Sequence, residues 1–221
     1  MYHLADGLSF MSSLADESVD GIFTDPPWGS GPAIAGQSEW KELIDALAQE
    51  ARRVLKPSGR CMVWVGMRQL GPTIEVMSRH LQYQWTVFVH YIPRRYVAHF
   101  EALLDPILIF SIGDLVIRGQ QGAKLRQVYT CSTVKRTTPH PCAKPLASVK
   151  HILADWFAPD EYVIDPFAGS DTTGRAAREL GLKWDSCEID PVMYLTGQKR
   201  HEQTVMEFAN GRGGGGGTLK P

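Results

Sequence analysis

Short apolar runs alternate along this chain with segments in which apolar residues recur every three or four positions. The runs predict β-strands, and the helical period predicts α-helices. Because strand and helix alternate, we expect an α/β domain whose mainly parallel sheet is covered by helices on both faces. The predicted strands cover residues 19–25, 60–66, 84–92, 103–112, 162–169 and 183–190, and the predicted helices cover about 39–55, 70–80, 146–157, 172–180 and 191–209.

Three segments interrupt this pattern. Pro106 stands inside a predicted strand, and because proline donates no backbone hydrogen bond, it indicates an edge strand or a bulge. Residues 114–138 have no sustained period and are rich in Gly, Gln and Thr, so they are predicted to form an insertion. The Gly-rich residues 210–221 have the composition of a flexible linker. We therefore expect one domain over residues 1–209, interrupted by the insertion and followed by a flexible tail.

Composition and charge exclude several classes of protein. Hydrophobic residues make up 43% and charged residues 21% of the 221 residues, as in a globular protein that buries a full core. The formal net charge is -1, so any affinity for nucleic acid must come from a local basic patch. No apolar run approaches the roughly 20 residues that cross a bilayer, so no membrane segment is expected.

The cysteines indicate a reducing compartment. Cys61, Cys131, Cys142 and Cys187 lack paired spacing, and no charged-then-apolar signal begins the chain. Cys131, His140 and Cys142 could be imagined as zinc ligands, but a fourth partner at the proper spacing is missing. The sequence therefore predicts a cytoplasmic protein without a metal site.

The segment "DPFAGSDTTG", residues 165–174, lies where a predicted strand turns into a helix. Its small residues let a ligand approach the backbone, and the amides that begin the helix offer hydrogen-bond donors. Glu188 follows Gly169 by 19 residues, a spacing at which an acidic side chain can bind the hydroxyls of a ribose. The dinucleotide pattern GxGxxG is absent, and Asp165 would repel a pyrophosphate. The loop therefore favours a cationic nucleoside cofactor, and S-adenosylmethionine has that character.

A second stretch, "TDPPWGSG" at residues 24–31, combines a carboxylate, a rigid backbone and an aromatic plane at the end of a strand. The exocyclic amine of adenine or cytosine is a poor nucleophile, because its lone pair is delocalised into the ring. If Asp25 and the carbonyl of Pro26 each accept an amine hydrogen, that lone pair is freed, and proline fixes the carbonyl direction. Trp28 would stack on the face of an extrahelical base. These residues predict a site for a flat, amine-bearing molecule.

The order of these motifs resembles a known family. "DPPW", followed much later by "DPFAGSDTTG" and "EID", resembles the S-adenosylmethionine-dependent amino-methyltransferases of DNA in their permuted, beta-class order. The opening "LADGLSFMSSLADESVDGIFTDPPW" and the segment "HPCAKPLASVKHIL" are also similar to the family, so the resemblance covers nearly the whole chain. It implies a Rossmann-like, doubly wound class I methyltransferase fold with a small inserted target-recognition region.

The resemblance also implies roles for individual residues. Glu188 matches the ribose acid, Asp6 matches an acidic residue near the cofactor adenine, and Lys144 with Pro145 precedes the helix that borders the methionine end. The implied catalytic residues are Asp25, Pro26, Pro27 and Trp28. The implied residues for S-adenosylmethionine are Asp6, Asp25, Lys144, Asp165, Pro166, Phe167, Ala168, Gly169, Ser170, Asp171, Thr172 and Glu188.

One residue departs from the family pattern. The loop of the family usually reads DPFAGSGTT, and here Asp171 replaces the second glycine. Aspartate tolerates a positive φ better than most residues but not freely, and it adds negative charge beside a cationic cofactor. Asp171 could therefore weaken cofactor binding, tune it, or cap the helix that begins at Thr172.

The resemblance favours site-specific methylation of the adenine N6 amine on a flipped-out base of double-stranded DNA. A leading Asp and the tryptophan resemble adenine-modifying members, some of which act on RNA. The alternatives are N4-cytosine methylation, RNA adenine methylation, or a catalytically impaired nucleic-acid-binding subunit. Beta-class relatives commonly dimerise, so a homodimer is possible, as is a place in a restriction-modification system of a prokaryotic or phage-infected cell. The candidate DNA contacts are Arg94, Arg95, Arg118, Lys124, Arg126, Lys135 and Arg136.

Overall fold

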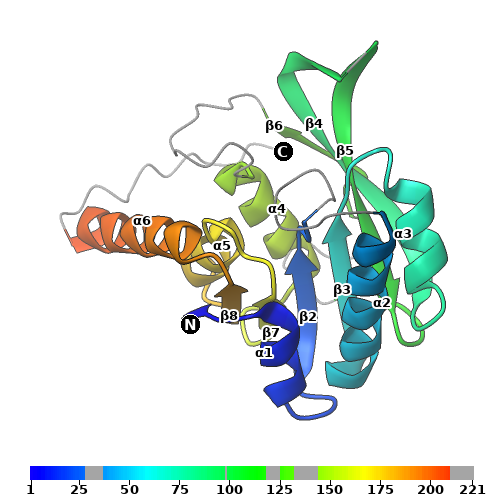
Figure 1. Ribbon diagram of the computed structural model, residues 1–221. Helices are drawn as coiled ribbons and strands as arrows, with labels where there is room; N and C mark the ends of the chain where they lie inside the picture. Colours follow the sequence, from blue (N-terminus) through cyan, green and yellow to red (C-terminus); the bar gives the residue numbers. More distant parts are fainter. Residues whose placement is uncertain (28–36, 98, 118–124, 132–143, 210–221) are drawn as a thin grey trace.

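A computed structural model describes residues 1–27, 37–97, 99–117, 125–131 and 144–209 of the chain. Its centre is an eight-stranded sheet with the order β1-β8-β7-β2-β3-β5-β4-β6 (Figure 1). The strands are β1 (Tyr2–Leu4), β2 (Val19–Thr24), β3 (Leu55–Trp64), β4 (Gln82–Val97), β5 (Phe100–Ser111), β6 (Val128–Cys131), β7 (Tyr162–Asp165) and β8 (Lys183–Glu188). The helices are α1 (Gly7–Ser13), α2 (Gln37–Val54), α3 (Leu70–Met77), α4 (Leu146–Trp156), α5 (Thr172–Glu179) and α6 (Pro191–Ala209).

The direction of the chain reverses between two central strands. Across the sheet, the neighbouring strands β1, β8, β7, β2 and β3 pair in parallel. The next strand, β5, is antiparallel to both of its neighbours, β3 and β4. From β7 the chain continues through α5 to β8 on one side, and from β2 it continues through α2 to β3 on the other. The carboxyl ends of β7 and β2 therefore flank a topological switch point, which is where open α/β sheets bind ligands.

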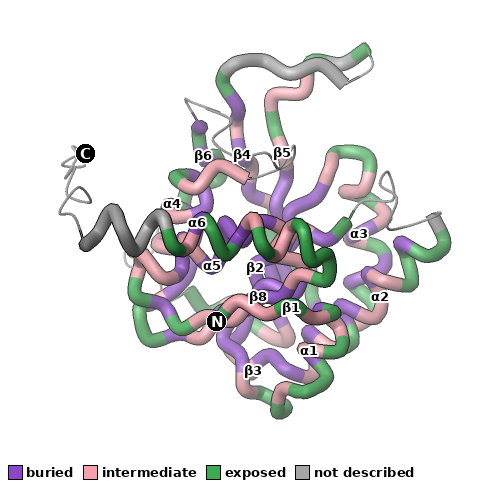
Figure 2. Tube along the Cα trace, turned by 60° about the vertical axis from the view of Figure 1, so that its left-hand side comes forward, coloured by how far each residue is buried: buried purple, intermediate pink, exposed green. Residues whose placement is uncertain are grey.

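Helices cover both faces of the sheet because successive strand residues point to opposite sides. Ile22 packs in a cluster with α1, α2 and α3, while its neighbour Phe23 packs in a second cluster with α4 and α5. The central strands are accordingly buried on both faces, and the outer surfaces of the helices are exposed (Figure 2). This arrangement confirms the predicted α/β fold with a mainly parallel, doubly covered sheet.

Two short elements at the start of the chain were not expected from the sequence. Strand β1 pairs in parallel with β8 and places Leu4 opposite Glu188. Helix α1 follows at once, and the carboxylate of Asp6 caps it by accepting a hydrogen bond from the backbone N–H of Ser9 at 2.8 Å. The N-terminal residues therefore lie beside the loop after β8 rather than outside the fold.

The expectation that Pro106 marks an edge or a bulge is wrong. Strand β5 lies between β3 and β4, and Pro106 pairs with Phe88 without a register shift there. The carbonyl of Pro106 accepts a hydrogen bond from the N–H of Val65 at 2.9 Å. Because the nitrogen and the carbonyl of a strand residue point to the same side, the Pro106 nitrogen also faces β3, which has just ended at Trp64. The hydrogen bond that proline cannot donate is thus lost only at the end of that ladder.

The predicted insertion of residues 114–138 contains an unexpected strand. Strand β6 pairs in parallel with β4 at the edge of the sheet, and Tyr129 and Cys131 are buried. The exposed Val128 and Thr130 alternate with these two residues, which is the period of a half-buried strand. Residues 118–124 and 132–138 of the predicted insertion lie outside the described residues, as does the predicted flexible tail of residues 210–221.

Candidate active site

Asp165 ends β7 at the switch point and is buried. Its Oδ1 accepts a hydrogen bond from the Thr24 hydroxyl at 2.7 Å and another from the backbone N–H of Phe167 at 3.1 Å. Burial raises the pKa of Asp165 to about 7, although hydrogen bonds from Thr173 and Thr24 act in the opposite direction. Asp165 is therefore a carboxyl group that can gain or lose a proton near neutral pH.

Asp25 follows the end of β2, on the strand next to Asp165, and is more open. Its side chain is 28% exposed, and its Oδ2 lies 2.5 Å from the ammonium nitrogen of Lys144. That ammonium also lies 5.0 Å from the centre of the Trp64 ring, within the range of a cation–π contact. Pro26 is buried and Pro27 is exposed, while Trp28 falls outside the described residues. The structure thus brings together Asp25 and Lys144, which are far apart in the sequence.

The loop after β7 is held from three directions. Gly7 lies so close to Pro166 that an added Cβ would come 2.0 Å from the Pro166 carbonyl oxygen, so α1 requires glycine here. Gly169 has φ of 54°, and its N–H donates to Glu188 Oε2 at 2.8 Å. The Tyr2 hydroxyl donates to the Gly169 carbonyl at 2.5 Å. Strand β1, α1 and the end of β8 therefore fix the backbone of this loop.

Asp171 takes the left-handed conformation and caps a helix. Its φ and ψ are 55° and 51°, and its Oδ1 accepts a hydrogen bond from the N–H of Gly174 at 3.0 Å, so α5 begins at Thr172. Its Oδ2 lies 2.5 Å from Nε2 of His201. Among the three roles left open for this departure from the family loop, helix capping is present in the structure.

The acidic groups at this edge of the sheet fit a cationic nucleoside. Tyr2 lies among them, because Asp171, Glu188 and Asp165 add to burial in raising its pKa. Glu188 accepts hydrogen bonds from Gly169 and Asp190, one on each carboxylate oxygen. Each oxygen has a second lone pair, so Glu188 can also accept two ribose hydroxyls. These carboxylates therefore suit a ligand that has ribose hydroxyls and a positive charge, and S-adenosylmethionine has both.

Apart from Asp6, the remaining predicted cofactor residues lie on this loop or at its ends. Phe167, Ala168 and Gly169 are half-buried, so parts of them reach the surface of the loop. Ser170 and Thr172 are buried, and both face the guanidinium of Arg200. Asp6 is exposed at the start of α1. Ser170 and Thr172 thus lie on the inner side of the loop, and Phe167 to Gly169 lie on its outer side.

The candidate DNA contacts are only partly described. Arg94 and Arg95 lie near the carboxyl end of β4, where β4 and β5 project beyond the other strands (Figure 1). Because β4 runs in the same direction as β3, this hairpin extends from the same edge of the sheet as Asp25. Arg126 contacts the buried carboxylate of Asp155 at 3.4 Å. Arg118, Lys124, Lys135 and Arg136 fall outside the described residues.

Sequence reasoning missed several residues that organise this site. Thr24 stands directly before "DPPW". Its place at the end of a predicted strand could have indicated that it lies in the site. Tyr2, Arg200 and His201 contact the loop from β1 and α6, and nothing in their local sequence indicates it. Their contacts depend on tertiary packing between segments far apart in the chain.

Metal sites and membrane-spanning helices can be assessed within the described residues. There, no group of three or more His, Cys, Asp or Glu side chains is arranged to hold a metal ion. Cys131 is buried, and its imagined partners His140 and Cys142 lie outside the described residues. In the same part of the chain, no helix is both long enough and apolar enough to cross a membrane.

Solved structures share this fold, and one of them is named as a DNA methyltransferase. The complex of M1.HpyAVI with S-adenosylmethionine matches with a TM-score of 0.72 at 21% identity, covering 91% of this chain and 98% of that one. The PvuII cytosine-N4-specific DNA methyltransferase matches with a TM-score of 0.74 at 18% identity, covering 95% of this chain and 90% of that one. The predicted class I methyltransferase fold is therefore confirmed.

The sequence comparisons identify the family. The DNA adenine methyltransferase YhdJ of Escherichia coli K12 is 27% identical over 238 residues, covering 88% of this chain and 80% of the relative. The profile of the N6/N4 methyltransferase family, described as DNA methylase, matches residues 19–199. Because that match spans most of the sequence and confirms the resemblance found in its motifs, the chain belongs to the DNA methylase family of S-adenosylmethionine-dependent amino-methyltransferases.

Proposed function

We propose that this protein transfers a methyl group from S-adenosylmethionine to the N6 amine of adenine in double-stranded DNA. The observation that carries this proposal is the pair of carboxylates at the switch point. Asp165 is buried at the end of β7, and Asp25 is partly open at the end of the adjacent β2. One carboxylate can thus organise the methyl donor while its neighbour receives the amine. The name of the relative YhdJ, a DNA adenine methyltransferase, supports adenine as the base.

The loop after β7 would hold the methyl donor. When bound, S-adenosylmethionine supplies a methyl group on a positively charged sulfur. Glu188 would accept the ribose hydroxyls, Asp6 would lie near the adenine, and the outer side of Phe167, Ala168 and Gly169 would contact the nucleoside. Asp165 would provide negative charge beside the positive donor once it has lost its proton.

The residues after β2 would bind the base. Asp25 and the carbonyl of Pro26 would each accept one hydrogen of the amine, which frees the nitrogen lone pair for attack. Trp28 would stack on the base, as aromatic side chains do with flipped-out nucleotides. The ammonium of Lys144 lies 2.5 Å from Oδ2 of Asp25. Each carboxylate oxygen has two lone pairs, so Asp25 can accept an amine hydrogen beside that ion pair. Alignment of the amine nitrogen with the methyl carbon is then the main contribution of the protein.

The position of the basic residues supports DNA as the polymer. Arg94 and Arg95 lie on the hairpin that projects from the same edge of the sheet as Asp25. Basic side chains at that place can neutralise phosphates next to a base that enters the site. Action in the bacterial cytoplasm accords with the origin of YhdJ in Escherichia coli. A homodimer stays a prediction.

A label-transfer assay tests the proposal. Purified protein is incubated with methyl-labelled S-adenosylmethionine and mixed-sequence duplex DNA, and the DNA is digested to nucleosides. We expect the label in N6-methyladenine. Label in N4-methylcytosine would instead favour the chemistry of the PvuII enzyme, which shares the fold. Label only in a matched RNA substrate would contradict the assignment to DNA, and donor binding without transfer to either polymer would indicate an impaired subunit.

A further inference from the structure

Asp171 has a buried carboxylate that needs partners. Its side chain is 0% exposed, and its backbone occupies a conformation with φ of 55° that residues other than glycine rarely adopt. The N–H of Gly174 satisfies Oδ1. Because an unsatisfied buried carboxylate oxygen is costly, Oδ2 requires a donor of its own.

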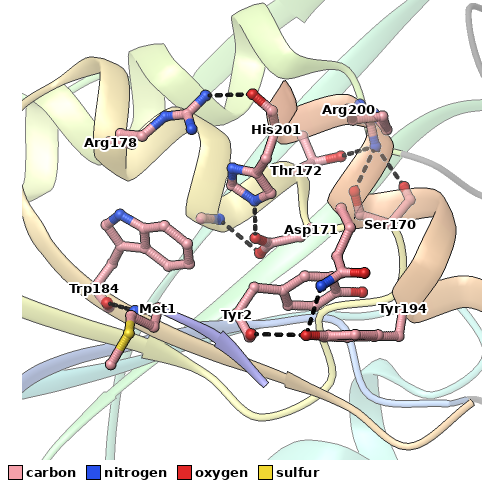
Figure 3. A network of polar contacts seen from close by, with 12 residues as sticks. Met1, Tyr2, Ser170, Asp171, Thr172, Arg178, Trp184, Tyr194, Arg200 and His201 are labelled. Atoms are coloured by element: carbon pink, nitrogen blue, oxygen red, sulfur yellow. Dashed lines mark hydrogen bonds and ion pairs between the residues drawn. The ribbon is translucent and has the colours of Figure 1, made fainter. Parts of the chain in front are cut away.

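His201 of α6 supplies that donor. Its Nε2 lies 2.5 Å from Oδ2 of Asp171, and its ring stacks on Trp184 with an interplanar angle of 3° and a centroid distance of 5.3 Å. Figure 3 shows the imidazole between the indole of Trp184 and the carboxylate of Asp171. The carbonyl of His201 also accepts a hydrogen bond from Arg178 at 3.5 Å. The ring is thus fixed on one face by Trp184 and at its edge by Asp171.

The neighbouring residues are adapted to this pair. A Cβ on Gly174 would lie 2.4 Å from Oδ2 of Asp171 and 2.7 Å from the Trp184 ring, so only glycine fits between the carboxylate and the indole. Gly197 likewise allows Tyr2 to pack against α6, because a Cβ added at this position would lie 2.5 Å from the Tyr2 ring. Close packing on both sides leaves the Asp171 side chain little freedom to turn elsewhere.

A second residue of α6 holds the same loop. The guanidinium of Arg200 donates to the carbonyl of Ser170 at 2.8 Å, to its hydroxyl at 2.5 Å, and to the Thr172 hydroxyl at 3.3 Å (Figure 3). Arg200 and His201 therefore contact three consecutive residues of the loop, from Ser170 to Thr172. Helix α6 acts as a support behind the part of the loop that turns from β7 into α5.

The loss of His201 would affect the part of the loop that is proposed to bind S-adenosylmethionine. Without its donor, Oδ2 of Asp171 would remain buried and unsatisfied, or the loop would leave the left-handed conformation. Asp165 is close enough to respond, because the charge of Asp171 contributes to the raised pKa of Asp165. The first outcome strains the loop, and the second alters the backbone between Asp165 and Thr172, which carries the candidate surface for S-adenosylmethionine.

We propose that His201 is a positioning residue for the methyl donor: its hydrogen bond to Asp171 keeps residues 169–172 in the conformation that binds S-adenosylmethionine. This inference rests on the proposed function, because it concerns the cofactor of that reaction. It makes Asp171 and His201 a unit, so that a loop carrying the aspartate reaches its full affinity for the methyl donor only when the histidine is present.

A double-mutant cycle on the full chain tests this dependence. The dissociation constant for S-adenosylmethionine is measured by calorimetry for the wild type, H201A, D171G and D171G/H201A. We expect H201A to weaken binding roughly tenfold, within the range of coupling between contacting side chains. Adding H201A to D171G should change the affinity less than about twofold, as for independent sites. In H201Q, an amide N–H can replace Nε2, so much of the affinity should return.

Controls separate positioning from general stability. His80, which follows α3, also pairs with an aspartate, Asp45 of α2, at 3.0 Å. This pair lies away from the loop, so H80A should leave the affinity unchanged. A positioning role predicts that H201A raises KM for S-adenosylmethionine with little change in kcat. A merely structural role predicts a lower unfolding temperature without a change in affinity, and that result would overturn the inference.

Two further outcomes are decisive. An equal loss of affinity on adding H201A to the wild type and to D171G would also overturn the inference, because the effect would not pass through Asp171. If the wild type binds S-adenosylmethionine and the variants show no coupling, only the inference fails. If the wild type does not bind S-adenosylmethionine at all, the proposed function fails and the inference fails with it.

Discussion

Asp165 and Asp25 end neighbouring parallel strands, yet their surroundings differ. Asp165 is buried and accepts hydrogen bonds from Thr24 and from the backbone of Phe167. Asp25 is 28% exposed, and its Oδ2 forms an ion pair with Lys144 at 2.5 Å. The buried carboxylate is thus held by hydrogen bonds within the protein, whereas the other side chain is partly open to solvent. A methyltransferase needs both properties, because the donor must be held still while different bases enter and leave.

The loss of Asp25 should have the largest effect. D25A removes the proposed acceptor of an amine hydrogen, so methyl transfer should fall by about 10²–10⁴-fold, the usual contribution of such a group. The unfolding temperature should change little, because the side chain is partly exposed. Initial rates with labelled S-adenosylmethionine and DNA measure the effect. D160N, at another exposed aspartate, serves as the control. Near-normal transfer by D25A would refute the role assigned to Asp25.

Asp165 should make stability depend on pH. Burial raises its pKa from 3.8 to about 7, so between these values the folded protein keeps a proton that the unfolded chain has lost. The resulting stabilisation is fully present below about pH 4 and is lost as the pH rises through 7, with a slope of at most about 1.4 kcal/mol per pH unit. Urea unfolding of the ligand-free protein across this range should show the decline.

The variant D165N isolates this contribution. Asparagine does not titrate, so the free energy of unfolding of D165N should vary less with pH than that of the wild type between about pH 4 and 7. Parallel pH profiles for the two proteins would mean that Asp165 has an ordinary pKa and that its burial does not act as described.

The loss of Lys144 should have a smaller effect on activity. K144M leaves Asp25 without the cation that orients Oδ2, so kcat should fall severalfold. The free energy of unfolding should change by no more than about 1 kcal/mol, because both partners are partly exposed. K150M is a matched control, since Lys150 forms a similar ion pair with Glu179 at 2.7 Å away from Asp25. A similar decrease in kcat for both variants would argue against a specific role for Lys144.

The smallest change concerns Thr24. T24V keeps the shape of the side chain but removes the hydroxyl that donates to Asp165, which should lower the free energy of unfolding by about 1 kcal/mol. T86V removes an exposed hydroxyl that contacts Tyr83 and should cost less. Chemical denaturation compares the two variants. Equal stability of T24V and the wild type would show that this hydrogen bond does not help to fix Asp165.

The sequence predicted elements that are long or fully buried. The run "VDGIFT" is buried at every position and was recognised as a strand, and α2 was recognised from its apolar period. Strand β1 has three residues and α1 has seven, too few for either period to show. Strand β6 alternates buried and exposed residues but stands in a segment rich in Gly, Gln and Thr, which concealed it.

The site was predictable where its chemistry is local in the sequence. Asp25 and Asp165 were identified from the motifs around them, and the cap formed by Asp171 was one of the roles considered. The ion pair of Lys144 with Asp25 and the contact of His201 with Asp171 join segments that only the fold brings together. Neither contact follows a spacing that a helix or strand imposes, so no sequence pattern could have indicated them.

The central claim, that Asp165 serves the methyl donor and the side chain of Asp25 serves the base, is tested most directly by titrating S-adenosylmethionine into D25A and D165N. A hydrogen bond or charge contact to a charged ligand is worth about 1.5–3 kcal/mol, so D165N should lose roughly tenfold or more in affinity. D25A should bind the donor nearly as well as the wild type, while its methyl transfer falls by about 10²–10⁴-fold. Wild-type affinity in D165N, or loss of donor binding in D25A, would contradict the claim.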